Sequence, residues 1–364
     1  MIDSHSHPLA ETGGPLDLAG INLMLAPDEQ TQSSRAASAP MRLSQELMAV
    51  RLASQLGCAV EELAQAREQA SSDWPAYVSS LFRSCGLRGL VLDPGWALAA
   101  STANASALAD LTGCQVRTIM RLEPMVDRMI EEGATAAEIV RAVEQAVAEA
   151  RAHGYVGLKT ILAYRTGLAV DPTVTMEAAA ESLRVKDLPV RRRGKPLRDL
   201  LTRRVLGWAA ELHLPLQIHT GFGDSEIRLQ EASPLLLEEL LSTPEGSAAT
   251  VVLIHGSYPW HEELAFLALV RPNVYAELSL FNIFAPATVA DRLERILELV
   301  PADKVLCGTD GHGEPETFWF GALLIQEAWA KVRASWSQQG ARGTWLSQVE
   351  SAIFEGNTAS LYNF

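Results

Sequence analysis

Cysteines are scarce in this sequence, and long apolar runs are missing from it. The 364 residues include four cysteines, at positions 58, 85, 114 and 307, and none of them forms a Cys-x-x-Cys pair. So few cysteines in a chain of this length argue against a disulfide framework and indicate a reducing compartment. No stretch approaches the roughly 18 uninterrupted apolar residues of a membrane-spanning helix, so we expect no membrane partner.

Positive charge is also in short supply. Lysine and arginine number 30 against 44 aspartate and glutamate residues, which gives a net charge of −14. Proteins that bind nucleic acids carry a basic face, so we expect no nucleic-acid partner. A few local cations can still make a binding pocket positive, so a small anionic substrate is compatible with this net charge. The start has no basic segment followed by an apolar run, and we therefore expect a cytoplasmic protein.

Short apolar segments alternate with helical patterns along the chain. The length suits one barrel of about 250 residues with insertions, or two ordinary domains. Strands that alternate with helices indicate parallel βα units, and eight of them favour a closed (β/α)₈ TIM barrel over an open α/β sheet with an extra domain. The eight predicted strands are 1–7, 87–93, 115–123, 156–161, 214–219, 250–255, 273–278 and 304–310.

Two segments are longer than a single crossover needs. Residues 8–86 separate the first two strands, and their later part, Met41 to Cys85, has a helical pattern with a break near Gly57. We expect a helical cap over the barrel mouth, within one domain that spans residues 1–364. Such a cap could also support a homodimer. The second segment, 171–198, contains the basic run Arg191 to Lys195, which is either a solvated loop or a mobile lid over an acidic substrate.

Five potential metal ligands lie at predicted strand ends. His5 and His7 form a His-x-His pair at the end of the first strand, where alternate residues point to the same face. His219 ends the fifth strand, His255 ends the sixth and Asp310 ends the eighth. In a (β/α)₈ barrel all of these strand ends meet at one face, which is where active sites form.

Imidazole and carboxylate ligands suit Zn²⁺, with Mn²⁺, Fe²⁺ or Co²⁺ as alternatives. A catalytic ion of this kind keeps one position for water and lowers its pKa to about 7. Taken singly, each residue has a structural explanation, because a strand-end histidine often only makes a hydrogen bond and an aspartate before Gly311 could belong to a turn. Their conjunction at the right strand ends favours a metal site.

Four motifs surround these residues, namely Asp3-Ser-His-Ser-His7, Ile218-His-Thr-Gly-Phe-Gly-Asp224, Leu253-Ile-His-Gly-Ser-Tyr258 and Cys307-Gly-Thr-Asp310. With them the sequence resembles the amidohydrolase superfamily, in the branch called amidohydrolase 2, over nearly its whole length. Two further segments, Gly157 to Gly167 and Leu278 to Asn282, are similar to the amidohydrolase half of proteins fused to, or encoded near, a glutamine synthetase-like ligase.

The resemblance implies a site with one or two metal ions. His5, His7, His219 and Asp310 match the ligand positions of the family, and Asp310 matches a residue that commonly also accepts the proton of the attacking water. His255 matches a position that either binds a second metal or polarises the bound water.

Lys159 ends the fourth predicted strand, where some members of the family carry a carboxylated lysine that bridges two metals. Its flanking pattern looks more like the branch with one metal, in which the lysine meets the substrate, so one ion is favoured. A lysine that leaves the core and pairs with Glu123 is the structural alternative.

Several residues near strand ends are candidates for substrate contact. Arg165 or Arg121 could form a bidentate pair with a substrate carboxylate. Arg121 and Glu123 could equally form a structural ion pair, and Trp96 could stack on the substrate or pack beneath the cap. The candidates are Lys159, Arg165, Arg121, Trp96, Tyr164, Tyr258 and His312, with Asp93, Gly95, Glu123, Glu277, Asn282 and Glu314 nearby.

Two kinds of reaction are the main candidates, while sugar-acid isomerisation and a non-catalytic metal-binding role are further alternatives. The first is hydrolysis of an amide C–N bond by a metal-activated water, with Asp310 or His255 moving the proton. The association with glutamine synthetase-like ligases implies, by analogy, a γ-glutamyl amide as the small-molecule substrate. The second is non-oxidative decarboxylation of a small aromatic or unsaturated acid, which uses the same metal cluster.

Overall fold

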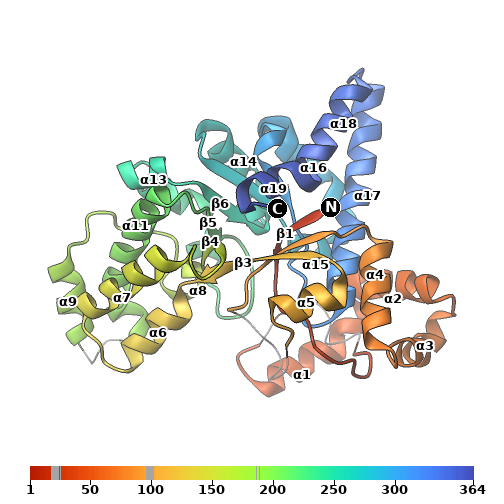
Figure 1. The fold of residues 1–364 in the computed structure, drawn as a ribbon, viewed down its shortest axis with the longest axis horizontal. Coiled ribbons are helices and arrows are strands. Elements are labelled where there is room, and N and C mark those ends of the chain that lie inside the picture. Colours follow the sequence, from red (N-terminus) through yellow and green to blue (C-terminus); the bar gives the residue numbers. More distant parts are fainter. Residues whose placement is uncertain (18–23, 25, 96–101, 186, 188) are drawn as a thin grey trace.

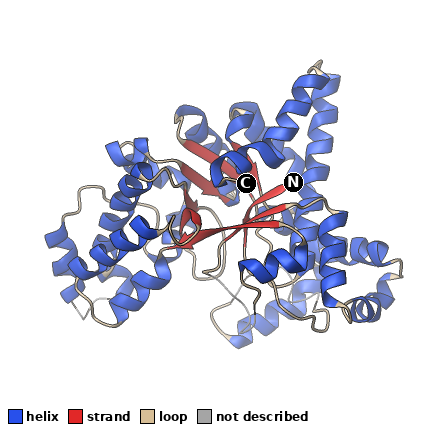
Figure 2. Ribbon diagram, viewed as in Figure 1, coloured by secondary structure: helices blue, strands red, loops and turns tan. Residues whose placement is uncertain are grey.

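Eight parallel strands occupy the centre of the molecule, and helices surround them (Figures 1 and 2). The computed structural model describes residues 1–17, 24, 26–95, 102–185, 187 and 189–364. Each strand pairs in parallel with the next, in the order β1 to β8, so the expected (β/α)₈ barrel is confirmed. The strands are β1 Ile2–Ser6, β2 Gly89–Leu92, β3 Gln115–Arg121, β4 Tyr155–Thr160, β5 Leu216–His219, β6 Val251–Ile254, β7 Val274–Leu278 and β8 Val305–Cys307.

Main-chain hydrogen bonds beyond the last strand close the ring between β8 and β1. The amide of Asp310 donates to the carbonyl of His5 (3.0 Å), and the amide of His7 donates to the carbonyl of Gly311 (2.8 Å). The two ends of the sheet therefore meet through the segment that follows β8. We call this junction the seam, and three of the predicted metal ligands lie on it.

The helices follow the strands around the barrel. After β1 come α1 Glu29–Ser38, α2 Leu43–Leu56, α3 Leu63–Ala70 and α4 Trp74–Ser84, and after β2 comes α5 Ala105–Thr112. The loops after β3, β4 and β5 lead into α6 Glu123–Glu131, α7 Ala136–Glu149, α8 Leu162–Arg165, α9 Met176–Arg184, α10 Val190–Arg193, α11 Lys195–Glu211, α12 Glu238–Leu241 and α13 Pro244–Ala248. The remaining helices are α14 His261–Val270, α15 Phe281–Phe284, α16 Val289–Leu299, α17 Pro315–Gln338, α18 Gly343–Ser351 and α19 Asn357–Tyr362.

Helix α7 illustrates how the sequence produces these elements. Thr135 caps its start, and Glu138 bonds back to the amide of Thr135 in a capping box. Ile139, Val143 and Val147 recur at the helical spacing and are buried against the barrel. None of the helices within the described residues is both long enough and apolar enough to cross a membrane.

Helices α1 to α4 occupy much of the long segment between β1 and β2. Gly57 adopts a left-handed conformation (φ 71°) and ends α2, at the break expected from the sequence. Helix α4 packs against α17, where the rings of Phe82 and Phe318 lie 5.3 Å apart. The role of residues 8–86 as a cap over the mouth stays a prediction.

Arg67 of α3 ties this segment to the chain that follows β8. Its side chain is fully buried, with Nε donating to Glu316 Oε1 (2.8 Å) and Nη2 donating to Glu314 Oε2 (2.7 Å). Tyr77 of α4 also donates to Glu316 Oε1 (2.6 Å). Since Glu314 lies four residues beyond Asp310, this network holds the segment that carries a predicted metal ligand.

The last helix covers the amino-terminal end of the strands. Tyr362 of α19 is fully buried and packs with Val91 and Ile119 inside the barrel. Its hydroxyl accepts a hydrogen bond from Gln217 (2.8 Å). The barrel is therefore filled by side chains at this end, and the accessible cavity lies at the other.

Candidate metal centre

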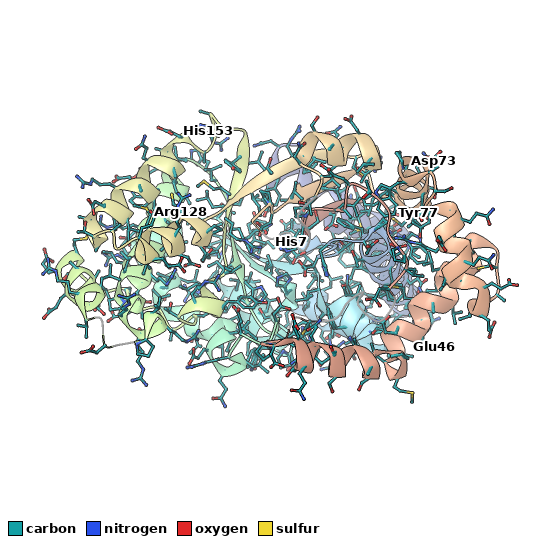
Figure 3. The ribbon with its side chains drawn as sticks, turned by 90° about the horizontal axis from the view of Figure 1, so that it is seen from below. His7, Glu46, Asp73, Tyr77, Arg128 and His153 are labelled. Atoms are coloured by element: carbon teal, nitrogen blue, oxygen red, sulfur yellow. The ribbon has the colours of Figure 1, made fainter. Side chains whose placement is uncertain are left out.

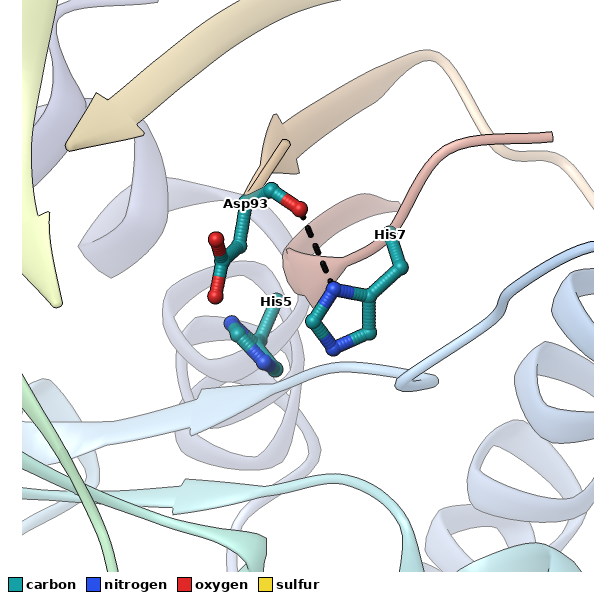
Figure 4. A group of neighbouring side chains, drawn as sticks. All are labelled: His5, His7 and Asp93. Carbon is teal, nitrogen blue, oxygen red and sulfur yellow. Dashed lines mark hydrogen bonds between the residues drawn. The ribbon is translucent and has the colours of Figure 1, made fainter. Parts of the chain in front are cut away.

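The His-x-His pair lies inside the barrel mouth (Figure 4). His5 is fully buried and His7 nearly so, and in Figure 3 His7 lies near the middle of the molecule while His153 lies at its margin. The Nδ1 atom of His7 lies 3.1 Å from the carbonyl oxygen of Asp93. A carbonyl can only accept, so Nδ1 carries a proton and Nε2 is the ring atom left to face a metal, as in metal-binding histidines.

Asp310 faces this pair across the seam. Its Oδ1 atom lies 3.2 Å from His7 Nε2 and 3.4 Å from His5 Nε2. Burial and the nearby Lys159 and His7 hold the pKa of His5 well below its usual value, so its ring is neutral. Within the described residues, Asp310 Oδ1 and His5 Nδ1 are buried without a hydrogen-bond partner.

The arrangement therefore fits a bound cation. Lone pairs that converge on one buried point are costly unless a positive charge accepts them. A donor set of imidazole nitrogens and carboxylate oxygens suits Zn²⁺ and its first-row neighbours. Two groups have potential ligand atoms within 4.8 Å of one another, namely His5, His7 and Asp93, and His5, His255 and Asp310.

His255 is oriented for the same role by Ser279. The Ser279 hydroxyl donates to Glu277 Oε2 (2.8 Å) and lies 2.9 Å from His255 Nδ1, so it can accept a hydrogen bond from that nitrogen. The Nε2 atom of His255 is then the ring atom available to a metal. The backbone of His255 is left-handed (φ 71°), and its amide donates to Glu277 Oε2 (3.1 Å).

His219 is brought into the cluster but stands apart from the two close groups. Its ring lies 4.5 Å from that of His255 and 4.7 Å from that of Tyr164. Its Nε2 atom lies 3.1 Å from the carbonyl of Phe222 and donates to it, which leaves Nδ1 as the lone-pair atom. The ligand role of His219 stays a prediction.

Two buried carboxyl groups support the backbone beneath the ligands. Asp3 accepts hydrogen bonds from the amides of Thr309 (2.9 Å) and His5 (3.2 Å), and burial raises its pKa to about 7. Burial also raises the pKa of Glu277 to about 8, although hydrogen bonds from His255, Ser279 and Ser4 oppose that rise. Together these carboxyl groups contact all three chain segments that carry His5, His255 and Asp310.

Lys159 lies at the end of β4 within the cluster. Its side chain is buried, and Nζ lies 3.5 Å from His5 Nε2. Burial lowers its pKa to about 8, although Asp93 and Asp310 favour the charged form. The alternative pairing of Lys159 with Glu123 is wrong, because Glu123 instead accepts a hydrogen bond from Thr160 Oγ1 (2.5 Å).

The two arginines predicted to contact substrate both have carboxylate partners. Arg121 donates to Asp93 from Nε (2.9 Å) and Nη2 (2.6 Å), so the alternative ion pair with Glu123 is also wrong. Burial opposes ionisation of Asp93, but Arg121, His7 and Lys159 together outweigh it and lower the Asp93 pKa. Arg165 donates to Asp127 (2.8 Å) and lies 3.6 Å from Glu226.

The remaining candidates divide between the cavity and its surroundings. The hydroxyl of Tyr164 accepts from the amide of Asp224 (3.1 Å), and His312 bonds through Nδ1 to the carbonyl of Asp310 (2.8 Å). Tyr258 does not line the cavity and packs against Phe222 instead, with the ring centroids 4.7 Å apart. Trp96 lies outside the described residues.

A cavity of about 530 Å³ opens above the ligands, a volume in the usual range for small-molecule sites. The basic run from Arg191 to Lys195 is mostly helical, because α10 ends at Arg193 and α11 begins at Lys195. Arg191 donates to the carbonyls of Tyr164 (3.1 Å) and Arg165 (2.5 Å), so it holds α8 in place. The described residues that line the cavity include His7, Arg121, Glu123, Asp127, Lys159, Tyr164, Arg165, His219, Glu226, His255, Leu280, Phe284, Asp310 and His312.

Two residues of the site, Asp93 and Leu280, differ from what the sequence predicts. Asp93 was expected to contact substrate, but its position after β2 places a carboxylate within ligand distance of His5 and His7. Leu280 was not singled out at all, although it lines the cavity with a positive φ of 58°. A strand-end rule could have identified Asp93, whereas no pattern in the sequence marks Leu280.

Comparison with known proteins agrees with this geometry. The sequence model of the family described as Amidohydrolase matches residues 2–364. Protein fluG from Emericella nidulans is 37% identical over 206 residues, which cover 51% of this chain and 23% of that protein. The chain thus spans less than a quarter of that relative's length.

Solved structures show the same fold. A Lactobacillus casei protein described provisionally as a metal-dependent hydrolase is 27% identical, with a TM-score of 0.88 over 100% of this chain and 95% of that one. Uronate isomerase from Thermotoga maritima is 13% identical, with a TM-score of 0.71 over 100% of this chain and 94% of that one. The second likeness concerns the fold alone.

Proposed function

Because this chain belongs to the amidohydrolase family, we propose that it is a metal-dependent hydrolase that cleaves the amide C–N bond of a small carboxylated amide. The observation that carries the proposal is the convergence of His5 Nε2, His7 Nε2 and Asp310 Oδ1 on one buried point. We further propose that a single Zn²⁺ occupies this point, and that a γ-glutamyl amide is the substrate. A cytoplasmic location and a homodimer stay predictions.

His5, His7 and Asp310 would hold the ion, with His255 and His219 beside it. A divalent ion bound there would polarise a substrate carbonyl and lower the pKa of a water molecule. Asp310 or His255 would take a proton from the attacking water and return it to the departing nitrogen. A neutral amine is a much better leaving group than an amide anion, so this protonation is needed for the C–N bond to break.

The charged residues of the cavity would orient the acyl part of the substrate. Arg165 is about one third exposed at the cavity, and its guanidinium can add a substrate carboxylate to its contacts with Asp127 and Glu226. Arg121 is less available, since Asp93 takes up both Nε and Nη2. We therefore propose Arg165 as the carboxylate-binding residue.

Metal content and reaction products test the proposal. We expect about one transition-metal ion per chain in the wild type, by elemental analysis, and loss of most of it in His5→Ala. His153→Ala is the matched control, because His153 is exposed and bonds only within its own turn. Equal metal content in wild type and His5→Ala would refute the site.

The products then separate the two kinds of reaction. A γ-glutamyl amide should release glutamate and an amine in equal amounts. Release of carbon dioxide from an unsaturated or aromatic acid, with no amide cleavage, would instead support the decarboxylase alternative. Metal binding without either reaction would leave the hydrolase proposal refuted.

A further inference from the structure

The cavity above the ligands has two chemically different walls. Residues that follow β3 and β4 make one wall, which carries Arg121, Glu123, Asp127 and Arg165, and Glu226 lies 3.6 Å from Arg165. Leu280 and Phe284, which follow β7, make the facing wall. In a ring of eight strands in the order β1 to β8, β7 stands four strands from β3 in either direction. The charged wall and the apolar wall therefore oppose each other across the mouth.

The predicted metal ligands lie between these walls. His7 and Asp310 come from the seam between β8 and β1, while His219 and His255 follow β5 and β6. A bond cleaved at this cluster would have one substituent directed to the charged wall and the other to the apolar wall.

Leu280 is held toward the cavity by a strained turn. It has φ 58° and ψ −62°, and the amide of Phe281 donates to the carbonyl of Ser279 (2.6 Å). These are the features of the strained, positive-φ form of the γ-turn, which is rare. Such a conformation persists only where its surroundings hold it, and strain of this kind gathers at ligand-binding positions.

The residues on both sides of Leu280 fix its backbone conformation. Ser279 is bonded to His255 and Glu277, and Phe281 and Asn282 are fully buried. Leu280 itself is 7% exposed, and that exposure is to the cavity it lines. The turn thus places an isobutyl group one residue away from the serine that orients His255.

Phe284, the last residue of α15, extends the apolar surface. Its ring lies 5.7 Å from that of Phe222 at a right angle, and the guanidinium carbon of Arg42 lies 5.0 Å from its centroid. Phe222 is in turn packed on Tyr258. The wall is therefore backed by aromatic side chains and has little freedom to recede from a ligand.

We propose that the substrate is the γ-glutamyl amide of an apolar amine, with the amine seated on Leu280 and Phe284 and the glutamyl carboxylate facing Arg165. The inference rests on the proposed hydrolase function and adds the chemical class of the leaving group. Leu280 is the residue that determines specificity. Water attacks the amide carbon, the C–N bond breaks, and the departing nitrogen gains a proton to leave as the free amine.

Two probes test the apolar wall, γ-glutamyl benzylamide and γ-glutamyl methylamide. The wild type should favour the benzylamide in kcat/KM by about tenfold or more, which is what one or two apolar groups contribute in a pocket. Leu280→Ala should remove most of this preference, because it should lower kcat/KM for the benzylamide by a larger factor than kcat/KM for the methylamide. Leu280→Gly should do the same, and it is the second variant because glycine tolerates the positive φ. Leu299→Ala, on an exposed residue of α16, is the matched control and should keep the preference.

Arg165→Met tests the opposite wall. It should lower kcat/KM for both amides by a similar factor and leave their ratio unchanged, because it alters only the acyl side. A changed ratio would overturn the assignment of the two walls.

Calorimetry separates failure of this inference from failure of the hydrolase proposal. Benzylamine and methylamine carry the same charge, so their difference in Kd reports the apolar wall without any turnover. If the wild type cleaves neither amide but binds benzylamine about tenfold more tightly, and Leu280→Ala removes that difference, the apolar wall stands and the hydrolase proposal falls. If the two amines bind alike, or the difference survives in both Leu280 variants, the wall is overturned even when amides are cleaved.

Discussion

Replacement of Arg67 by methionine should destabilise the fold by about 3–5 kcal/mol, because it leaves a buried carboxylate without its charge partner. Glu316 is fully buried, and its Oε1 atom receives Arg67 Nε at 2.8 Å. The contact with Glu314 adds less, because that side chain is 35% exposed and water screens it. Loss of the guanidinium over the rings of Trp74 and Tyr77, 5.1 and 5.3 Å from the centroids, contributes about 0.5–2 kcal/mol within that range.

A second substitution separates charge from packing. Glu316→Gln removes the stranded charge but keeps an acceptor for the hydroxyl of Tyr77. The double variant, Arg67→Met with Glu316→Gln, should therefore recover about 2 kcal/mol relative to Arg67→Met alone. The measurement is urea unfolding of the wild type, both single variants and the double variant, followed by tryptophan fluorescence. A loss below about 1 kcal/mol for Arg67→Met, or no recovery in the double variant, would refute the reasoning.

Three further predictions concern the buried layer under the ligands and the strained turn. The folded protein holds the Glu277 proton more tightly than the unfolded chain, with a pKa of about 8, so its contribution is complete below about pH 4 and is lost as the pH rises through 8. Glu277→Gln should accordingly flatten the fall in unfolding free energy of the metal-free protein between pH 5 and 9, and an unchanged slope would contradict this. Leu280→Gly should be more stable than Leu280→Ala by about 1 kcal/mol in chemical denaturation, the reverse of the usual order, because only glycine relieves the positive φ. Gly308→Ala should cost about 1–3 kcal/mol, since its methyl group would collide with Glu277 Oε1 and lie 2.9 Å from Ser4 Oγ, whereas Gly343→Ala, with nothing within 4 Å, should be neutral.

The barrel could be predicted from the sequence because each strand is marked by its own short apolar segment, and counting these segments gives the number of strands. Runs such as Val251 to Ile254 are apolar throughout, which is typical of strands buried on both faces, and they reappear as paired strands. The family was recognised from motifs at the ends of these strands and is confirmed. The approximate position of the site follows from the same rule, because parallel strand ends must share one face.

The detailed geometry of the site could not be predicted in this way. Whether Arg121 pairs with Asp93 or Glu123 depends on the register between β2, β3 and β4, and both acids stand at plausible positions in the sequence. The proton arrangement on His255 depends on Ser279, which lies on the neighbouring strand end. The positive φ of Leu280 has no sequence signal, since leucine is an unfavourable residue for that conformation.

The seam has a consequence for how the protein is made. Ribosomal synthesis produces Asp310 roughly 300 residues after His5 and His7. One edge of β1 therefore has no partner strand until β8 and the segment after it have been synthesised. An unpaired edge of that kind favours association with other chains. Contacts between residues so far apart in sequence generally slow folding. An ion bound by both sides of the seam would act as a non-covalent cross-link between β1 and the segment after β8. The contact between them would then be more stable in the metal-bound protein than in the metal-free protein.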